Sequence, residues 1–274
     1  LARPLSTAAQ EVAIDDLVGL KQAVMTMAAG HPLATTENAY VMARLARGAG
    51  GMASSFVESD QGVTLADGTP LGPSLKQALE PVLDAFDKGD QQIFEAYLVS
   101  LRVLELHDRG LPQAITQSEA KNIIQEVKQR PDFVAFEKAR EAIYAHQDAV
   151  LEYAIDGGLL TQEQADTIRK VNRFYVPFNR AQDESEPTGF LNRAAELSGA
   201  RRGIAGQRAP IQRIGESAKD LLPPLQQIIA NDFAWVSAVE QNRAMLALTD
   251  QAAGRRRGQK GVAVPDSARW LQRI

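Results

Sequence analysis

The feature that most constrains this fold is an apolar stripe of helical period between residues 133 and 155. Its members are Phe133, Phe136, Ile143, Val150 and Ala154, with Tyr144, Leu151 and Ile155 alongside. Spacings of three, four and seven residues lay side chains along one face of an α-helix, so this face must be buried. Asp132 stands at the N-cap position, and Gly157-Gly158 ends the stripe because glycine adopts a left-handed C-cap at low cost. A long, packed helix is therefore predicted.

The residues after this helix predict a helical hairpin. Thr161, with Gln164 three positions later, is a capping-box pattern that starts a second, shorter helix. Pro177 disfavours helical geometry in the residue before it, so residues 174–178 should run extended, with their aromatic side chains against the helix pair. The structural clasp that we expect there consists of Tyr175, Pro177 and Phe178.

Helical periodicity recurs through most of the chain, and one short stretch departs from it. Apolar spacing and breaker residues predict further helices at about 7–29, 35–47, 74–86 with a kink at Pro81, 90–107, 116–130 and 223–253. Two short β-prone runs between residues 62 and 72 flank Asp67-Gly68, which is a hairpin signal. The predicted fold is mainly all-α, a multi-helix bundle with one small β-hairpin and a long C-terminal helix that begins at Pro223-Pro224.

Charge is unevenly distributed along the chain. The formal net charge is −4, but residues 1–186 carry 17 Lys and Arg against 27 Asp and Glu, whereas residues 187–274 carry 13 against 7. Such asymmetry is typical of contacts between segments or subunits, or with nucleic acid. We expect an acidic helical body at 1–180, a basic, loop-rich linker at 181–222, and a long helix with a basic C-terminal segment at 223–274. We also expect the chain to be a fragment of a larger protein.

Several kinds of chemistry find no support in the residue types. The chain has no cysteine, which excludes disulfides, thiolate metal sites and a cysteine nucleophile. The glycine cluster at 48–51 lacks the lysine and Ser or Thr of a phosphate-binding loop, so a helix-terminating turn is predicted there. The histidines His31, His107 and His146 show no paired i, i+4 spacing. A metal site at His146 with Glu141 or Glu152 would need carboxylates from other helices.

Catalytic residues are not indicated, and we expect neither a cofactor nor an enzymatic activity. The carboxylates nearest to apolar or aromatic neighbours are Glu37, Glu58 and Glu95. A peptidoglycan-cleaving domain with a dispersed carboxylate site remains an alternative, because a carboxyl group whose pKa is raised by an apolar pocket could serve as its acid.

The basic stretches are the most function-like feature of the sequence. Arginines in glycine-rich and proline-rich surroundings suit salt-dependent, sequence-independent contact with phosphates or a partner, and no aromatic residues are interleaved with them for base stacking. The candidate contact residues are Arg201, Arg202, Arg208, Arg213, Arg255, Arg256, Arg257 and Lys260. No apolar run approaches the length of about 18 residues that a transmembrane helix needs.

The order of these elements resembles a helical region of very large phage and mobile-element proteins. The resemblance covers residues 133–249 and rests on Leu151-Glu152-Tyr153-Ala154, Gly157-Gly158-Leu159-Leu160-Thr161, Tyr175-Val176-Pro177-Phe178 and Asn242. The similar proteins are internal virion (DNA-ejection) proteins of tailed phages and polyvalent antirestriction-type proteins. The chain departs from their pattern at Asn179, where an aromatic residue is common.

The resemblance implies a structural role. It predicts a non-enzymatic assembly module of a virion-associated protein that is packaged in the virion and delivered into the host cell, with itself or other virion proteins as partners. A DNA-contacting or antirestriction module of a large mobile-element protein is the alternative that the same resemblance leaves open.

Overall fold

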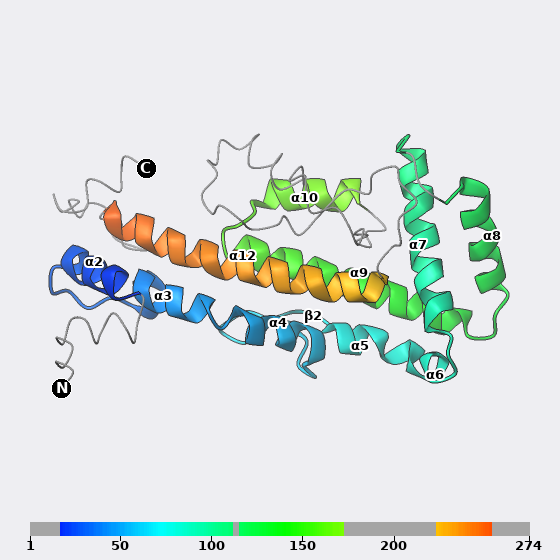
Figure 1. Cartoon of the computed structure of the whole chain (residues 1–274), viewed down its shortest axis with the longest axis horizontal. Coiled ribbons are helices and arrows are strands. Elements are labelled where there is room, and N and C mark those ends of the chain that lie inside the picture. The colour runs from blue at the N-terminus through cyan, green and yellow to red at the C-terminus, as the bar shows by residue number, and fades with distance from the viewer. Residues whose placement is uncertain (1–16, 112–114, 173–222, 254–274) are drawn as a thin grey trace, which may run out of the picture. The chain divides into compact units, whose positions relative to one another are not determined.

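The protein is described here by a computed structural model that covers residues 17–111, 115–172 and 223–253 (Figure 1). Its residues group into two compact units. Unit 1 comprises Leu1–Ala49 and Val239–Ile274, and unit 2 comprises Gly50–Ala238. The described residues are mainly helical and include one two-stranded sheet, which confirms the predicted fold class. The boundaries expected at residues 180 and 222, and the clasp of Tyr175, Pro177 and Phe178, lie outside the described residues.

Unit 1 contains three short elements and the end of the long C-terminal helix. These are α2 (Val18–Ala28), η1 (Thr35–Glu37), α3 (Ala39–Ala46) and the part of α12 (Pro224–Ala252) that begins at Val239. The side chain of Asn38 caps α3 by accepting a hydrogen bond from the backbone N–H of Val41 at 3.2 Å. A small apolar core of Val24, Ala39, Met42 and Ala247 holds these elements together.

The glycine cluster at 48–51 is where the predicted secondary structure is wrong. A turn does follow α3, but α4 (Ala49–Glu58) starts immediately and contains two of the glycines. Each helical glycine costs about 1 kcal/mol relative to alanine. Packing outweighs this cost, because α4 buries Phe56, whose ring stands edge-on to Tyr153 at 4.9 Å between centroids.

Unit 2 begins with the predicted hairpin, which is confirmed. Strand β1 (Val63–Thr64) pairs antiparallel with β2 (Pro70–Gly72). The turn uses Gly68 at φ 86°, and the Asp67 carboxylate accepts the backbone N–H of Thr69 at 2.9 Å. Gly72 then lies directly against α9, since a Cβ atom there would stand 2.8 Å from that of Ala149.

The core of unit 2 is formed by packed helices. In order these are α5 (Leu75–Leu79), η2 (Glu80–Val82), α6 (Leu83–Phe86), α7 (Gln91–Asp108), α8 (Gln117–Lys128) and α9 (Phe133–Asp156), joined by the first part of α12. Pro81 falls in the short 3₁₀ segment that interrupts the predicted helix at 74–86. The apolar stripe of α9 is buried as predicted at Phe136, Ile143, Val150 and Ala154, and Phe136 stands edge-on to Phe94 at 5.1 Å, whereas Phe133 is only partly buried.

The predicted C-terminal end of α9 at the paired glycines is confirmed, but the predicted capping role of Asp132 is wrong. Gly158 takes the left-handed conformation, at φ 68°, and Thr161 with Gln164 forms the predicted capping box of α10 (Gln162–Val171). Asp132 occupies the N-cap position without capping the helix, because its carboxylate is held by the guanidinium of Arg130, 2.9 Å from Nε. A cation two residues away therefore takes the oxygens that the helix end would otherwise use.

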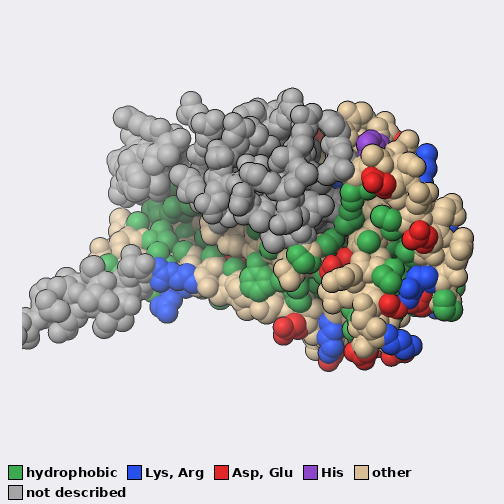
Figure 2. Space-filling model, turned by 45° about the vertical axis from the view of Figure 1, so that its right-hand side comes forward, with side chains coloured by type: hydrophobic (Ala, Val, Ile, Leu, Met, Phe, Trp, Pro, Cys, Tyr) green, Lys and Arg blue, Asp and Glu red, His purple; other side chains and the backbone are tan. Residues whose placement is uncertain are grey.

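Within the described ranges, no helix is both long and apolar enough to cross a membrane. On the face that Figure 2 presents, Asp and Glu side chains are interspersed with Lys and Arg.

Candidate functional site

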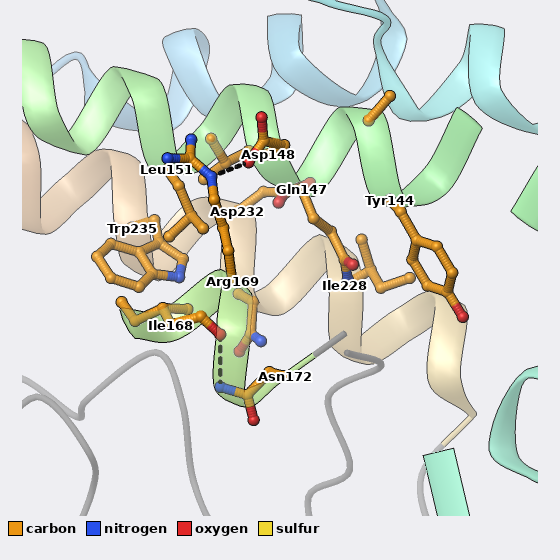
Figure 3. Close-up of a pocket in the computed structure, with 13 residues that line it drawn as sticks. Tyr144, Gln147, Asp148, Leu151, Ile168, Arg169, Asn172, Ile228, Asp232 and Trp235 are labelled. Carbon is orange, nitrogen blue, oxygen red and sulfur yellow. Dashed lines mark hydrogen bonds and ion pairs between the residues drawn. The ribbon is translucent and has the colours of Figure 1, made fainter. Parts of the chain in front are cut away.

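A cavity of about 380 Å³ lies in unit 2, where α9, α10 and the first part of α12 meet (Figure 3). Trp235 and Ile168 lie at one end of it and Tyr144 lies at the other, while Asp232 and Arg169 occupy the middle. Its volume is within the range of small-molecule sites. The cavity is therefore large enough for a ligand and combines apolar ends with a polar centre.

A buried histidine and a buried aspartate lie beside this cavity. His146 is 0% exposed and Asp232 is 2% exposed. The imidazole Nδ1 of His146 lies 2.9 Å from the carbonyl oxygen of Pro73, and its Nε2 lies 2.9 Å from Oδ2 of Asp232. The ring thus connects α9 to α12, 86 positions away in the chain, and to the residue that follows β2, 73 positions away.

The proton count of this pair follows from its hydrogen bonds. A backbone carbonyl only accepts, so Nδ1 of His146 must carry a hydrogen and donate it to Pro73. The contact between Nε2 and Oδ2 then needs one proton, which belongs either to an imidazolium facing a carboxylate or to a carboxyl group facing a neutral ring. In both forms the pair carries no net charge, which is the state that burial favours.

Burial raises the pKa of Asp232, and the hydrogen bond from His146 opposes part of that increase. Only Oδ2 is engaged, because His146 is the single hydrogen-bonding partner of this carboxylate among the described residues. Asp232 also lines the cavity. Its second oxygen, Oδ1, is therefore available to accept a hydrogen bond from a molecule bound there.

Arg169 connects α10 to α9 and neutralises part of an acidic surface. Its Nη1 donates to Asp166 at 3.1 Å, its Nε to Asp148 and its Nη2 to Glu152. These carboxylates and the surrounding hydrogen bonds raise the pKa of Arg169 despite partial burial. Each of the three guanidinium nitrogens thus donates to a carboxylate. The cluster has three negative charges and one positive charge, so its net charge is negative.

A second polar cluster ties α7 to α9. The phenol of Tyr97, a residue 2% exposed, donates to Oε1 of Glu137, and Arg140 binds the other oxygen at 3.0 Å. Burial and the neighbouring carboxylate raise the pKa of Tyr97. This cluster has the same form as the His146 pair, namely a buried side chain on one helix that bonds to another.

The metal site considered at His146 is wrong. Both ring nitrogens are used by Pro73 and Asp232, Glu152 binds Arg169, and Glu141 lies 3.3 Å from Arg140. In the described part of the chain, no three His, Asp or Glu residues gather as metal ligands would. His107 lies instead 3.0 Å from the carbonyl oxygen of Ile115.

The other candidate residues do not converge on the cavity. Glu37 accepts from the backbone N–H of Ala34, Glu95 accepts from Gln91, Glu58 is exposed, and none of the three carboxylates lines the cavity. All eight basic residues proposed for phosphate or partner contact lie in 173–222 or 254–274, outside the described residues: Arg201, Arg202, Arg208, Arg213, Arg255, Arg256, Arg257 and Lys260.

Sequence reasoning missed Asp232, Trp235 and Arg169 as residues of one site. The sequence does contain a signal for Asp232, because it is the one charged residue between positions 221 and 239. His146 similarly follows Ile143 by three positions and so shares the buried face of α9.

Comparison of the chain with protein-family models, with curated proteins and with solved structures finds no match.

Proposed function

We propose that this chain is a non-enzymatic structural module of a large phage virion-associated protein, of the DNA-ejection kind that is carried in the virion and delivered into the host. The resemblance carried by residues 133–249 motivates the proposal. The observation that supports it most is the buried contact of His146 with Pro73 and Asp232, which fixes three distant segments of unit 2 in one arrangement.

The polar ties within unit 2 support a rigid body more directly than they support catalysis. His146 links α9 to α12, Arg169 links α10 to α9, and Tyr97 links α7 to α9. Buried polar pairs of this kind add little net stability relative to apolar packing, but they can specify one arrangement among several. A module that must present the same surface in every copy of an assembly benefits from that property.

Assembly is the testable core of the proposal. Sedimentation velocity of the chain, alone and with a labelled DNA duplex at low and moderate salt, separates the candidates. The proposal expects an oligomer of defined size whose sedimentation is the same with and without the duplex. A monomer at all concentrations, with or without DNA, would refute the assembly role.

The same measurement tests the DNA-contacting alternative, which the basic balance of residues 187–274 favours. Binding that weakens steeply as salt rises indicates phosphate contact, because each neutralised phosphate releases a counterion. The variant with Arg255→Gln, Arg256→Gln and Arg257→Gln should then lose affinity. A matched variant with Arg169→Gln, whose guanidinium is already occupied by three carboxylates, should not.

A further inference from the structure

The cavity in unit 2 has walls suited to a flat, apolar body. Trp235, Ile168 and Ile228 each expose 4% or less of their surface, so they are held in place by packing before any ligand arrives. Figure 3 shows the indole of Trp235 beside Ile168 at one end and the phenol ring of Tyr144 at the other. In a preformed apolar site of this size, few side chains lose conformational entropy when a ligand binds.

One polar atom in the cavity has a fixed position and an unused bonding capacity. The carboxylate of Asp232 is oriented by the 2.9 Å contact of Oδ2 with His146, and Oδ1 has no partner among the described residues. Because Asp232 is 2% exposed and faces the cavity, a ligand N–H or O–H that reaches Oδ1 is partly shielded from competing water and gains more than it would at the open surface. The site therefore favours a ligand that carries a hydrogen-bond donor.

The charges around the cavity exclude an anion and offer little to a cation. Every nitrogen of the Arg169 guanidinium already donates to a carboxylate, and three carboxylates surround that one cation. A phosphate or carboxylate on the ligand would meet net negative charge. A cation would find that negative charge only at the exposed rim, where Asp148 lies, and inside the cavity it would lose its hydration beside a pair that is already neutral.

We infer that this cavity binds a small, uncharged aromatic heterocycle whose ring N–H donates a hydrogen bond to Oδ1 of Asp232. The ring packs against Trp235, Ile168 and Ile228, and the oriented carboxylate selects for the donor. This binding site is independent of the structural role proposed above.

Four indole compounds test the proposal on the unmodified chain. Indole has the ring and the donor, N-methylindole lacks the donor, indole-3-acetate adds a negative charge and tryptamine adds a positive one. Titrations followed by ¹H–¹⁵N NMR report binding at the indole N–H signal of Trp235, which Trp270→Phe assigns, because the chain has two tryptophans. Indole should bind at least about tenfold more tightly than N-methylindole, which lacks one buried hydrogen bond, and more tightly than either charged compound.

Two variants locate the site. Ala145 lines the cavity and is exposed, so Ala145→Phe should fill the space and weaken indole binding at least about tenfold by occlusion of the apolar walls. Val134→Phe is the matched control, because Val134 is 63% exposed on the same helix and does not line the cavity. If Ala145→Phe does not fold, the ligand series on the unmodified chain still decides the matter.

Three outcomes would overturn the inference. The first is equal affinity for indole and N-methylindole, or no binding of indole up to its solubility limit. The second is tighter binding of tryptamine or indole-3-acetate than of indole. The third is indole binding that survives Ala145→Phe in a folded chain.

Discussion

Removal of the Asp232 carboxylate should destabilise unit 2 in a way that depends on what replaces it. Asp232→Ala leaves the fully buried His146 with an Nε2 that has no partner, whereas Asp232→Asn retains a side chain of the same shape. In the asparagine variant the amide can donate to Nε2 while Nδ1 still donates to Pro73, so no buried group is left without a partner.

The expected magnitudes follow from the burial of the pair. Breaking a buried ionic or hydrogen-bonded pair by removing one partner costs about 3–5 kcal/mol. The adjoining cavity can admit a water molecule to Nε2, so we expect the lower end of that range, about 3 kcal/mol, for Asp232→Ala. For Asp232→Asn we expect a loss of less than about 1 kcal/mol, the scale of exchanging one hydrogen bond for another.

Urea denaturation followed by the fluorescence of Trp235 measures both values, in a background with Trp270→Phe. Trp235 lies on α12 three residues from Asp232 and is 4% exposed, so it reports the unfolding of the region where the pair lies. A third variant, Val134→Ala, changes an exposed side chain on α9 and should leave the urea midpoint unchanged. If Asp232→Ala proves as stable as Asp232→Asn, the pair does not hold the helices together and the argument for a structural tie fails.

Four further predictions test other parts of the argument. Burial raises the pKa of Asp232, so the stability linked to its protonation is present below about pH 4, where an unfolded aspartate protonates, and is lost as the pH rises through the folded pKa. The unfolding free energy of Asp232→Asn, whose amide does not ionise, should therefore rise relative to that of the unmodified chain as the pH is raised above about 4, as urea titrations measure. Gly62→Ala should destabilise unit 2 more than Gly68→Ala, because both have positive φ but only at Gly62 would a Cβ atom meet the backbone oxygen of the paired strand; the difference should exceed about 1 kcal/mol. Phe136→Ala should cost about 3–5 kcal/mol in the same assay, since the ring is fully buried. Thr161→Ala should cost about 1 kcal/mol by removing the cap of α10, and Thr161→Ser should restore most of it.

The helices of this fold were predictable because their signals are local. Capping boxes at Thr116 and Thr161, the paired glycines after α9 and the Asp67-Gly68 turn each involve residues within a few positions of one another. Hydrophobic periodicity, together with capping and helix-breaking residues, specifies where an element begins and ends. The predictions were wrong where a distant or competing contact determined the local structure. In α4, the burial of Phe56 outweighs the low helix propensity of the glycines.

The candidate site was not predictable because its contacts cross large sequence separations. His146 and Asp232 lie 86 positions apart, and neither stands in a motif. Asp132 shows the same limit on a small scale, because it stands at the predicted N-cap position but does not cap the helix, since Arg130 binds its carboxylate. A single sequence shows that a histidine shares a buried helix face, but it does not show which side chain on another helix satisfies it.

The position of the His146–Asp232 pair also explains how α9 and α12 are held in one register. If α12 slipped by one helical turn, Ile228 or Val236 would replace Asp232 opposite the imidazole, and neither can accept or donate a hydrogen bond. A slip of α9 by one turn would likewise place Ala142 or Val150 opposite the aspartate. Each slipped arrangement leaves buried polar groups without partners, at about 1–3 kcal/mol for each group, although the apolar packing could be largely retained. The pair therefore discriminates against the alternatives even where it adds little to the stability of the native arrangement.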